Sequence, residues 1–379
     1  MTERRAVAIV GAGIAGFATG LALRKAGLCV EVFEKAPELR ASGGALLLWS
    51  NALHALGSLG LADPVLRVGT VVEQTEFRTD RGELLWTMPV GDLSHAAGAP
   101  TLLISRAELI EILAGAFGSA PMMGKRCVDF AIEGGGVELR FDDGDRVRSD
   151  ALVGADGLHS MVRAQTLGDK PARSAGQVAW VGIVDYAHPL LAPGRTVATV
   201  GRGLRFWAGG IGQRKVYWYA TVREEAADVA SMRGLAALFR GFHAPVCDLI
   251  LATEATAVVR TPVRDRPPAR TWGHGPVTLV GDAAHPSTPD LGQGACQALE
   301  DAVALGNAVS RASGFGAAFE AYQRRRLDRT ARVTNLSWLT AVQSMTADAL
   351  SCRVRNLGMR TVLPGLARAE LARILASRS

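Results

Sequence analysis

The feature of this sequence that most constrains the fold is a glycine pattern directly after an apolar segment near the amino end. Segment 11–16 reads GAGIAG and follows the apolar run Ala6–Val10, while residues 15–26 and 29–33 are predicted to form a helix and a second strand. In such a βαβ unit the first glycine permits a tight turn, the second lets a pyrophosphate approach the backbone, and the third allows close packing. The pattern therefore predicts a dinucleotide site at a helix N-terminus, where free N–H groups favour phosphate.

An acidic residue stands where such a site needs one. Glu34 ends the second predicted strand, in the position expected to bind ribose hydroxyls. Because NAD and FAD are both bound by this unit, the amino-terminal segment alone leaves the identity of the dinucleotide open.

Composition and charge exclude several other classes of protein. The 379 residues include five widely spaced cysteines without a CxxC pair and seven scattered histidines, so we expect reduced thiols, no metal site and a cytoplasmic protein. The net charge of +6 is mild. Its densest cluster, Arg324 to Arg326 with Arg329 and Arg332, has no interleaved aromatic residues and is interpreted as a solvated helix face rather than a nucleic-acid patch.

One segment without charged residues, 6–23, superficially resembles a membrane span or the apolar part of a signal sequence. Its three regularly spaced glycines and the charged residues Arg24 and Lys25 that follow favour a buried strand and a buried helix instead. We therefore expect no membrane span.

Predicted strands alternate with predicted helices at both ends of the chain, and the middle is rich in strands. Helices are predicted at 52–61, 106–115, 231–242 and from about 294 through most of the C-terminal hundred residues; strands are predicted at 71–77, 125–150 (a meander), 151–155, 216–222 and 277–281. This order predicts an α/β fold: a Rossmann-like domain (1–69, 104–172 and 263–325) interrupted by a β-sheet substrate domain (70–103 and 173–262), with a C-terminal helical region (326–379).

Two later segments identify the dinucleotide. Segment 150–163 reads DALVGADGLHSMVR and delivers Asp156 into a turn after a strand; segment 277–301 contains VTLVGDAAH, PSTPDLGQG and QALED. With the amino-terminal glycine pattern, and in this order, these segments resemble the class A flavoprotein monooxygenases, the para-hydroxybenzoate hydroxylase-like family. The resemblance covers nearly the whole chain and is strongest to the FAD-dependent urate hydroxylase and salicylate hydroxylase-like members.

The resemblance implies FAD as the cofactor and gives roles to matched positions. Asp282 would hydrogen-bond the ribityl chain, and residues 292–294 would open a helix whose N-terminus stabilises negative charge on reduced flavin. Arg106 would face the pyrophosphate or the ribityl chain, loop 43–45 would pass the flavin ring, and a backbone group at Cys127 would contact adenine. The residues expected to bind FAD are Gly11, Gly13, Ala15, Gly16, Glu34, Lys35, Gly44, Ala45, Arg106, Cys127, Asp156, Asp282, Pro289, Gly292, Gln293, Gly294 and Ala295.

Several of these positions also have purely structural interpretations. Asp156 and Asp282 are typical of helix caps and turns, and His285 is expected to be structural rather than catalytic. Glu300 and Asp301 are expected on a helix surface near the cofactor, without a chemical role.

The resemblance further implies the reaction. NADPH or NADH reduces FAD, O₂ adds to give a flavin C4a-hydroperoxide, and an aromatic or polycyclic small molecule is hydroxylated or epoxidised. The candidate catalytic residues are Arg205, Tyr217 and Asp290, because a guanidinium can anchor an anionic or carbonyl-bearing ring and a carboxylate can move a proton. Two other interpretations stay open: a surface ion pair for Arg205 and core packing for Tyr217.

Four aromatic residues of the central strands, Trp180, Phe206, Trp207 and Trp218, fit two interpretations equally well. They are consistent with a cavity for a flat apolar substrate and with ordinary buried sheet aromatics.

Other classes of protein are weighed against this one. A flavin-dependent reductase of an unsaturated small molecule would share the fold, and a non-catalytic FAD-binding protein would share the cofactor. A plain NAD dehydrogenase would leave the two later segments unexplained, and residues 179–184 (AWVGIV) lack the WxWxIP signature of flavin halogenases. Beyond the substrate and O₂ we expect no nucleic-acid partner, and either a monomer or a homodimer.

Overall fold

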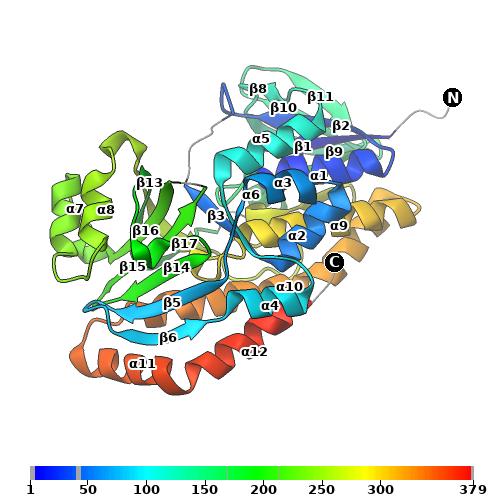
Figure 1. Ribbon diagram of the computed structural model, residues 1–379. Helices are drawn as coiled ribbons and strands as arrows, with labels where there is room; N and C mark the ends of the chain where they lie inside the picture. The colour runs from blue at the N-terminus through cyan, green and yellow to red at the C-terminus, as the bar shows by residue number, and fades with distance from the viewer. Residues whose placement is uncertain (1–4, 40–43, 169, 213, 377–379) are drawn as a thin grey trace.

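The glycine-rich segment lies at the carboxyl end of the first strand of a five-stranded parallel sheet, in a computed structural model that describes residues 5–39, 44–168, 170–212 and 214–376 (Figure 1). The strand order is β18-β12-β1-β2-β8. The strands are β1 (Ala6–Val10), β2 (Cys29–Glu34), β8 (Met122–Met123), β12 (Ala151–Gly154) and β18 (Val277–Leu279). The apolar side chains of the four longer strands are mostly buried, as expected for a parallel sheet covered on both faces, whereas Met122 of the short edge strand β8 is exposed.

Helices and two small antiparallel sheets surround this parallel sheet. The helix α1 packs against both α5 and α9. The small sheets are the meander β9-β10-β11 and the sheet β3-β7-β4. The elements concerned are α1 (Ile14–Lys25), β3 (Ala45–Leu48), α2 (Ser50–Leu59), α3 (Ala62–Val68), β4 (Thr70–Val71), β7 (Leu102–Ser105), α5 (Arg106–Phe117), β9 (Cys127–Glu133), β10 (Gly136–Phe141), β11 (Arg146–Ser149), α6 (Met161–Leu167) and α9 (Gly294–Arg311).

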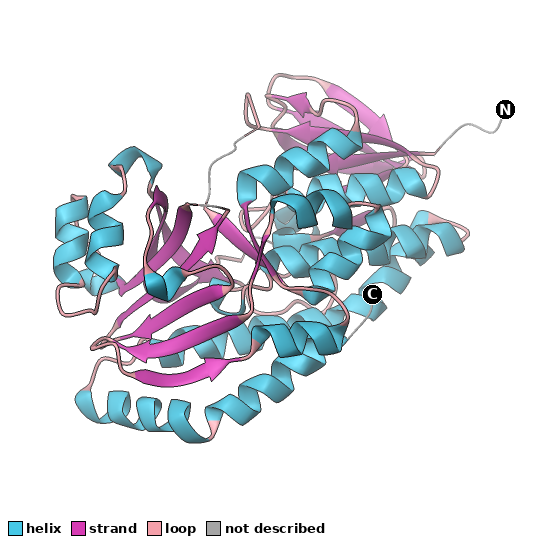
Figure 2. Ribbon diagram, in the orientation of Figure 1, coloured by secondary structure: helices cyan, strands magenta, loops and turns pink. Residues whose placement is uncertain are grey.

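A second large sheet has seven strands in the order β17-β13-β16-β15-β14-β5-β6. Figure 2 shows it as a separate layer beside the parallel sheet. Its strands are β5 (Gln74–Thr79), β6 (Leu84–Met88), β13 (Arg173–Asp185), β14 (Arg195–Val200), β15 (Leu204–Ile211), β16 (Lys215–Arg223) and β17 (Val259–Asp265). The helix α4 (Val90–Ala97) follows β6, and the helices α7 (Met232–Leu238) and α8 (Val246–Ala252) follow β16.

The two faces of the seven-stranded sheet have different partners. On one face Trp180, Phe206 and Trp218 form a core with Leu235 and Phe239 of the α7 region and with residues of α8. These three aromatics therefore build a second core, and the interpretation of them as the wall of a substrate cavity is wrong. Alternation along the strands turns Trp207 to the opposite face.

The C-terminal part is helical, as predicted, and runs beneath both layers (Figure 1). It comprises α10 (Phe315–Ser344), α11 (Ala349–Thr361) and α12 (Leu363–Ala376). The helix α10 packs on α9, α11 packs on β6, and α12 packs on α4 and α2.

Most predicted elements are confirmed within a few residues, and one is wrong. The predicted strand 71–77 is two strands, because the chain changes sheets at Val72 and Glu73. The Val72 N–H donates to the Thr101 carbonyl, whereas the N–H groups of Glu73 and Gln74 donate to the Gly194 carbonyl. Residues 70–71 thus pair with β7, and residues from 74 onward pair with β14.

Candidate active site

The glycine loop forms the tight turn that the sequence predicts. Gly11 has a φ of +109°, and a Cβ at this position would lie 2.4 Å from the Ala155 carbonyl oxygen. A Cβ on Gly16 would lie 1.9 Å from the Gly11 carbonyl oxygen, so helix and turn touch through backbone alone. A Cβ on Gly13 would meet nothing within 4 Å. The N-terminus of α1 is therefore open at Gly13, where the backbone is not covered by other described residues.

The predicted ribose-binding carboxylate lies beside this loop. Glu34 accepts a hydrogen bond from the Ala12 N–H at 2.9 Å through one oxygen, and from the Ala36 N–H at 2.9 Å through the other. Its neighbour Lys35 is exposed. Cys127 is buried, and burial raises the pKa of its thiol to about 11, so the thiol stays protonated and has no nucleophilic role at neutral pH.

Asp156 combines a structural role with a free acceptor. Its Oδ2 accepts hydrogen bonds from the N–H groups of Met161 at 2.8 Å and Val162 at 3.3 Å, at the start of α6. Asp156 therefore has the helix-end role that the sequence suggests, although the N-cap residue of α6 itself is Ser160. Its Oδ1 is buried without a hydrogen-bond partner among the described residues, and burial raises the pKa of this carboxyl. A buried acceptor without a partner is costly, so it marks a place where a ligand donor fits.

Asp282 faces the N-terminus of the long helix α9. A Cβ on Gly294, the first residue of that helix, would lie 4.0 Å from Asp282 Oδ1. The surrounding protein reduces the solvation of this carboxylate and raises its pKa, although part of its surface is open to solvent. The predicted site residues Ala15 and Ala295 are half-buried; Ala15 lies against Gly281, next to Asp282.

The segment before α9 is held by polar contacts to α2. Gly292 has a φ of +61° and packs against Leu47 and the indole of Trp49, while Pro289 is exposed. Gln293 is buried; its Oε1 accepts from Asn51 Nδ2 at 3.1 Å, and its Nε2 has no partner among the described residues. The amide of Gln293 is thus fixed at the helix N-terminus with two N–H donors unused.

The flavin loop predicted at 43–45 is described only from Gly44 onward, since Gly43 lies outside the described residues. Gly44 has a φ of +77°, and Tyr217 lies so close that a Cβ on Gly44 would be 2.7 Å from the tyrosine ring. The Gly44 carbonyl accepts from the Arg106 N–H at 3.0 Å, and Ala45 pairs with Ser105 in β3. Gly44 therefore joins the helix that starts at Arg106 to the seven-stranded sheet.

Two of the three candidate catalytic residues form a buried ion pair. Arg205 Nη1 donates to Asp290 Oδ1 at 2.5 Å, the Asp290 side chain is fully buried and that of Arg205 is 15% exposed. Arg205 Nη2 also donates to Gln177 Oε1 at 3.2 Å. The interpretation of Arg205 as part of a surface ion pair is therefore wrong. Burial lowers the pKa of Arg205, but the charge of Asp290 outweighs this cost, and the pKa is raised overall.

The third candidate, Tyr217, is on the same face of the sheet as Arg205. In the register of β15 and β16, Arg205 is opposite Thr221, Trp207 opposite Tyr219, and Gly209 opposite Tyr217, so all six share one face. The rings of Trp207 and Tyr217 are 5.8 Å apart. Tyr217 is half-buried, and burial raises its pKa, so its hydroxyl stays protonated at neutral pH.

Tyr219 was not predicted and belongs to the same group. Burial, followed by the charge of Asp290, raises its pKa to about 12. Its hydroxyl, Arg205 Nε and Asp290 Oδ2 are all buried without a partner among the described residues. The signal that points to it is the strand period of two, because Tyr217 and Tyr219 must share a face.

The acidic pair at 300–301 is not on a helix surface, and that prediction is wrong. Glu300 and Asp301 are 1% and 0% exposed. Arg326 Nε donates to Asp301 Oδ1 at 2.7 Å, Arg326 also pairs with Glu300, and Arg329 holds both oxygens of Glu300 at 2.6 Å. Burial alone would raise the pKa of both carboxyls, but Arg326 and Arg329 lower the pKa of Glu300, and His285 followed by Arg326 lowers that of Asp301.

The interpretation of the arginine cluster as one solvated face is wrong for the same reason. Arg324 and Arg332 are exposed and pair with surface glutamates, but Arg326 is fully buried and Arg329 largely so. The cluster also contacts the site: Asn51 Nδ2 donates to Glu300 Oε1 at 2.5 Å as well as to Gln293. His285 Nε2 lies 2.5 Å from Asp301 Oδ2, in keeping with the predicted structural role for His285.

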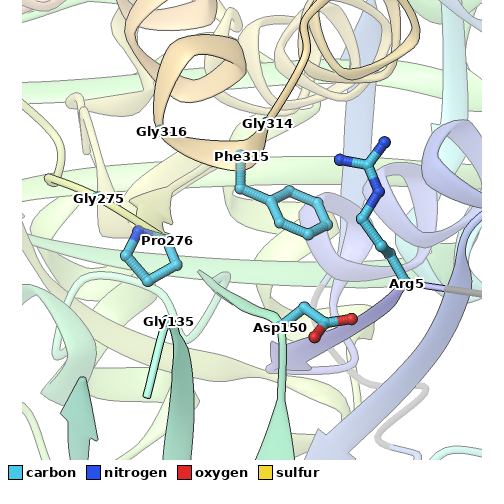
Figure 3. Close-up of a pocket in the computed structure, with 8 residues that line it drawn as sticks. All are labelled: Arg5, Gly135, Asp150, Gly275, Pro276, Gly314, Phe315 and Gly316. Atoms are coloured by element: carbon cyan, nitrogen blue, oxygen red, sulfur yellow. The ribbon is translucent and has the colours of Figure 1, made fainter. Parts of the chain in front are cut away.

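A further hollow of about 360 Å³ lies away from these residues (Figure 3). It is lined by Arg5, Asp150 and Pro276, which precede β1, β12 and β18, and by Phe315, over whose ring the Arg5 guanidinium lies at 5.4 Å. These are the amino ends of parallel strands, whereas ligands of such sheets bind beyond the carboxyl ends. This hollow is therefore not the candidate active site.

Within the described residues, no group of histidine, cysteine and acidic side chains is arranged to hold a metal ion. No described helix is long and apolar enough to cross a membrane.

Comparison with known proteins identifies relatives of this arrangement. A family model described as "FAD binding domain" matches residues 4–337. The chain is 37% identical to an aurachin C monooxygenase/isomerase of Stigmatella aurantiaca over 358 residues, 93% of each protein. It is 33% identical to the FAD-dependent urate hydroxylase of Klebsiella pneumoniae over 329 residues, 85% of each. The structure of Klebsiella pneumoniae HpxO complexed with FAD and uric acid superposes with a TM-score of 0.91 at 29% identity, covering 98% of this chain and 96% of the other.

Proposed function

The chain belongs to the class A family of FAD-dependent monooxygenases, and from that premise we propose that it transfers one oxygen atom of O₂ to an aromatic or polycyclic small molecule, with NADPH or NADH as the reductant. The predicted fold class and the predicted FAD cofactor are thereby confirmed. The binding residues, the substrate and the source of electrons belong to the proposal.

The residues of the dinucleotide site fit FAD. The open space at Gly13 lies at a helix N-terminus suited to a pyrophosphate, Glu34 suits a ribose, and the unpartnered Oδ1 of Asp156 suits a ligand donor. Asp282 beside the first residue of α9 would hold the ribityl chain. Bound FAD would supply the redox chemistry, accepting an electron pair and activating O₂.

The N-terminus of α9 would serve the flavin ring. Its first N–H groups have no partner within the helix, and the helix dipole places partial positive charge there. Gln293 adds unused side-chain donors at the same point. We propose that these groups stabilise negative charge on the reduced ring, and that the buried contacts of Asn51 and Glu300 hold Gln293 in place.

The observation that carries the substrate site is the buried Arg205–Asp290 pair at the α9 end of the seven-stranded sheet. Arg205 would anchor a carbonyl or anionic ring oxygen, Asp290 would accept a proton from the substrate, and the protonated Tyr217 would donate a hydrogen bond. Asp290 keeps an oxygen without a partner for this purpose.

The rest of this face suits an apolar ring system. The strand registers place Trp207, Ala198, Phe77 and Trp86 in one row across β15, β14, β5 and β6. The rings of Phe77 and Trp86 are stacked with their centres 4.8 Å apart. Such a row would exclude water from the oxygen-transfer step, as this chemistry requires.

The test is an oxygen-labelling assay with two probe substrates. Purified protein loaded with FAD would be incubated with NADPH or NADH, ¹⁸O₂ and either aurachin C or uric acid, the compounds named for two relatives. We expect substrate-stimulated NAD(P)H oxidation and one ¹⁸O atom in the product, with aurachin C favoured by the apolar row. Product formed without O₂ would instead support the reductase alternative, and absence of NAD(P)H oxidation with every aromatic compound tried would support a non-catalytic FAD-binding protein.

A further inference from the structure

The most exposed large apolar side chains of the described chain lie together on its last two helices. Five residues are 60% to 71% exposed, more than any other large apolar residue described. They are Leu350, Val354, Leu357, Val362 and Leu366. Exposed apolar residues are ordinary when scattered, but a group within seventeen consecutive positions is not, and marks an interaction surface.

Helical spacing gives this group an order. Leu350, Val354 and Leu357 are separated by four and three residues, so they form one stripe along α11. The opposite side of α11 is buried: Cys352 and Met359 pack inward, the latter against β6 and β14 residues. The stripe is therefore a second apolar face, directed away from the protein, that no described residue covers.

The charge of the two helices is mainly positive. Segment 349–376 contains five arginines and a single glutamate. Arg353 and Arg360 lie on the same side of the stripe and both are exposed; Arg360 also pairs with the exposed Glu83 at 2.8 Å, so Arg353 is the arginine whose charge bears most directly on the surface. A helix with an apolar stripe and arginines beside it is the type of surface that lies on an anionic bilayer, its apolar side chains inserted and its guanidiniums among the headgroups.

We propose that α11 and α12 attach the protein to anionic membrane surfaces as a peripheral, interfacial element. In a symmetric dimer formed through this surface, arginines of the two copies would face each other and repel. We therefore favour a membrane over a second copy of the chain. The proposal concerns a surface remote in sequence from the glycine loop and does not depend on the proposed reaction. The attachment would leave β6, which packs on the inner side of α11 and contributes Trp86 to the apolar row, separated from the lipid by this one helix.

The test is sedimentation of the FAD-loaded protein with vesicles of phosphatidylcholine alone or mixed with phosphatidylglycerol. We expect binding to the mixed vesicles, weak binding to phosphatidylcholine, and loss of binding at high salt, because each arginine at the surface contributes roughly a fivefold gain in partitioning. The triple variant L350S/V354S/L357S should lose binding, and R353E should weaken it by more than tenfold, roughly, since a charge is both removed and reversed.

A matched variant separates this surface from general hydrophobicity. Val128, Ile132 and Leu251 are 41% to 54% exposed and lie on β9 and α8, far from α11 in the fold (Figure 1). V128S/I132S/L251S should bind vesicles like the native chain, and the flavin spectrum of every variant reports that it is folded. Native protein that stays in the supernatant with both kinds of vesicle would overturn the proposal. So would a native dimer that the α11 variant converts to a monomer without change in vesicle binding, a result that would assign the surface to a second copy.

Discussion

Arg205 on β15 and Asp290 in the turn before α9 are 85 residues apart in the chain, and their charged groups meet at 2.5 Å inside the protein. The pair joins the seven-stranded sheet to the segment that opens the cofactor helix. Any movement of one layer against the other must therefore stretch or break a buried ion pair. The two residues thus stabilise the packing of the two layers and are also the candidates for substrate binding and proton transfer. Experiments on them must separate the effect on stability from the effect on activity.

Replacement of one partner should cost more stability than replacement of both. Arg205→Met leaves Asp290 buried without its counter-charge, and we expect a loss of about 3–5 kcal/mol in the free energy of unfolding. The double variant R205M/D290L removes both charges and should recover most of that loss. Urea unfolding followed by circular dichroism measures both values.

Activity should not recover with stability. If Arg205 anchors substrate and Asp290 moves a proton, the double variant should remain folded, bind FAD and still form no oxygenated product. A double variant that is stable and fully active would assign the pair to the fold alone.

Substitutions at two glycines of the same loop should have different effects, one on FAD affinity and the other on stability. Gly13→Ala places a Cβ in open space, so the free energy of unfolding should fall by no more than about 1 kcal/mol, the cost of the poorer N-cap residue alanine. The added methyl would occupy space that a pyrophosphate needs, and we expect FAD affinity to fall by roughly tenfold or more, about 1.4 kcal/mol. Absorbance near the flavin bands after dialysis against known FAD concentrations gives the affinity.

Gly16→Ala is the contrasting variant. Its Cβ would overlap the Gly11 carbonyl oxygen, so the fold itself should be destabilised, with little soluble protein. Gly115→Ala, in α5 with nothing within 4 Å of the new methyl, serves as the control and should leave both stability and FAD affinity intact or slightly improved. Native FAD affinity in Gly13→Ala would contradict the placement of the pyrophosphate.

The sequence predicts local geometry well where glycine and strand patterns decide it. The first strand is predicted to the residue, and the turn at Gly11 has the positive φ that only glycine adopts readily. The family resemblance brings Arg205 and Asp290 forward together, although nothing in their local sequence shows that they form a pair. Their contact depends on how two sheets pack, which no single-strand pattern encodes.

The errors have a common physical origin. Glu300, Asp301 and Arg326 are charged, and isolated charged side chains are rarely buried, so the sequence alone predicts that they are exposed to solvent. Burial becomes tolerable only because each finds its counter-charge on a helix some 25 residues away, a match that pairwise packing of α9 and α10 creates. Trp180, Phe206 and Trp218 were ambiguous because one strand face cannot be assigned to a cavity before its covering helices are known.

The buried charges of Glu300, Asp301 and Arg326 predict that the effect of an Arg326 substitution on stability depends on pH. The folded-state pKa values of Glu300 and Asp301 are lowered, so their stabilisation is present above the ordinary carboxyl range near pH 4 and is lost as pH falls through the lower folded values. Arg326→Met should cost about 3–5 kcal/mol at pH 7, because two buried carboxylates lose a shared cation.

The loss of stability caused by Arg326→Met should become smaller as the pH is lowered toward 3, because protonated carboxyls are neutral and need no counter-charge. Unfolding of native and variant protein at a series of pH values measures the difference directly. Arg324→Met, an exposed residue of the same helix, is the control and should change stability by less than about 0.5 kcal/mol at every pH. If Arg326→Met lowered the free energy of unfolding equally at pH 7 and pH 3, Arg326 would not contribute to the lowered pKa values of the two carboxyls.

Substitution of the two tyrosines of β16, Tyr217 and Tyr219, should distinguish a role in the reaction from a role in packing. Tyr217 touches Gly44 of the flavin loop and is half-buried, so Tyr217→Phe should lower the rate of product formation by about 10²-fold if its hydroxyl acts on the substrate. Since burial keeps the native hydroxyl protonated, the native enzyme should lose no activity through ionisation of Tyr217 up to about pH 9. Tyr219→Phe removes a buried hydroxyl without a partner and should leave stability equal or better by about 1 kcal/mol. The rate of product formation, measured for both variants with the same substrate, distinguishes them. A loss confined to Tyr217→Phe supports its chemical role, and an equal loss in both would mean that the hydroxyls act together through the Arg205–Asp290 pair.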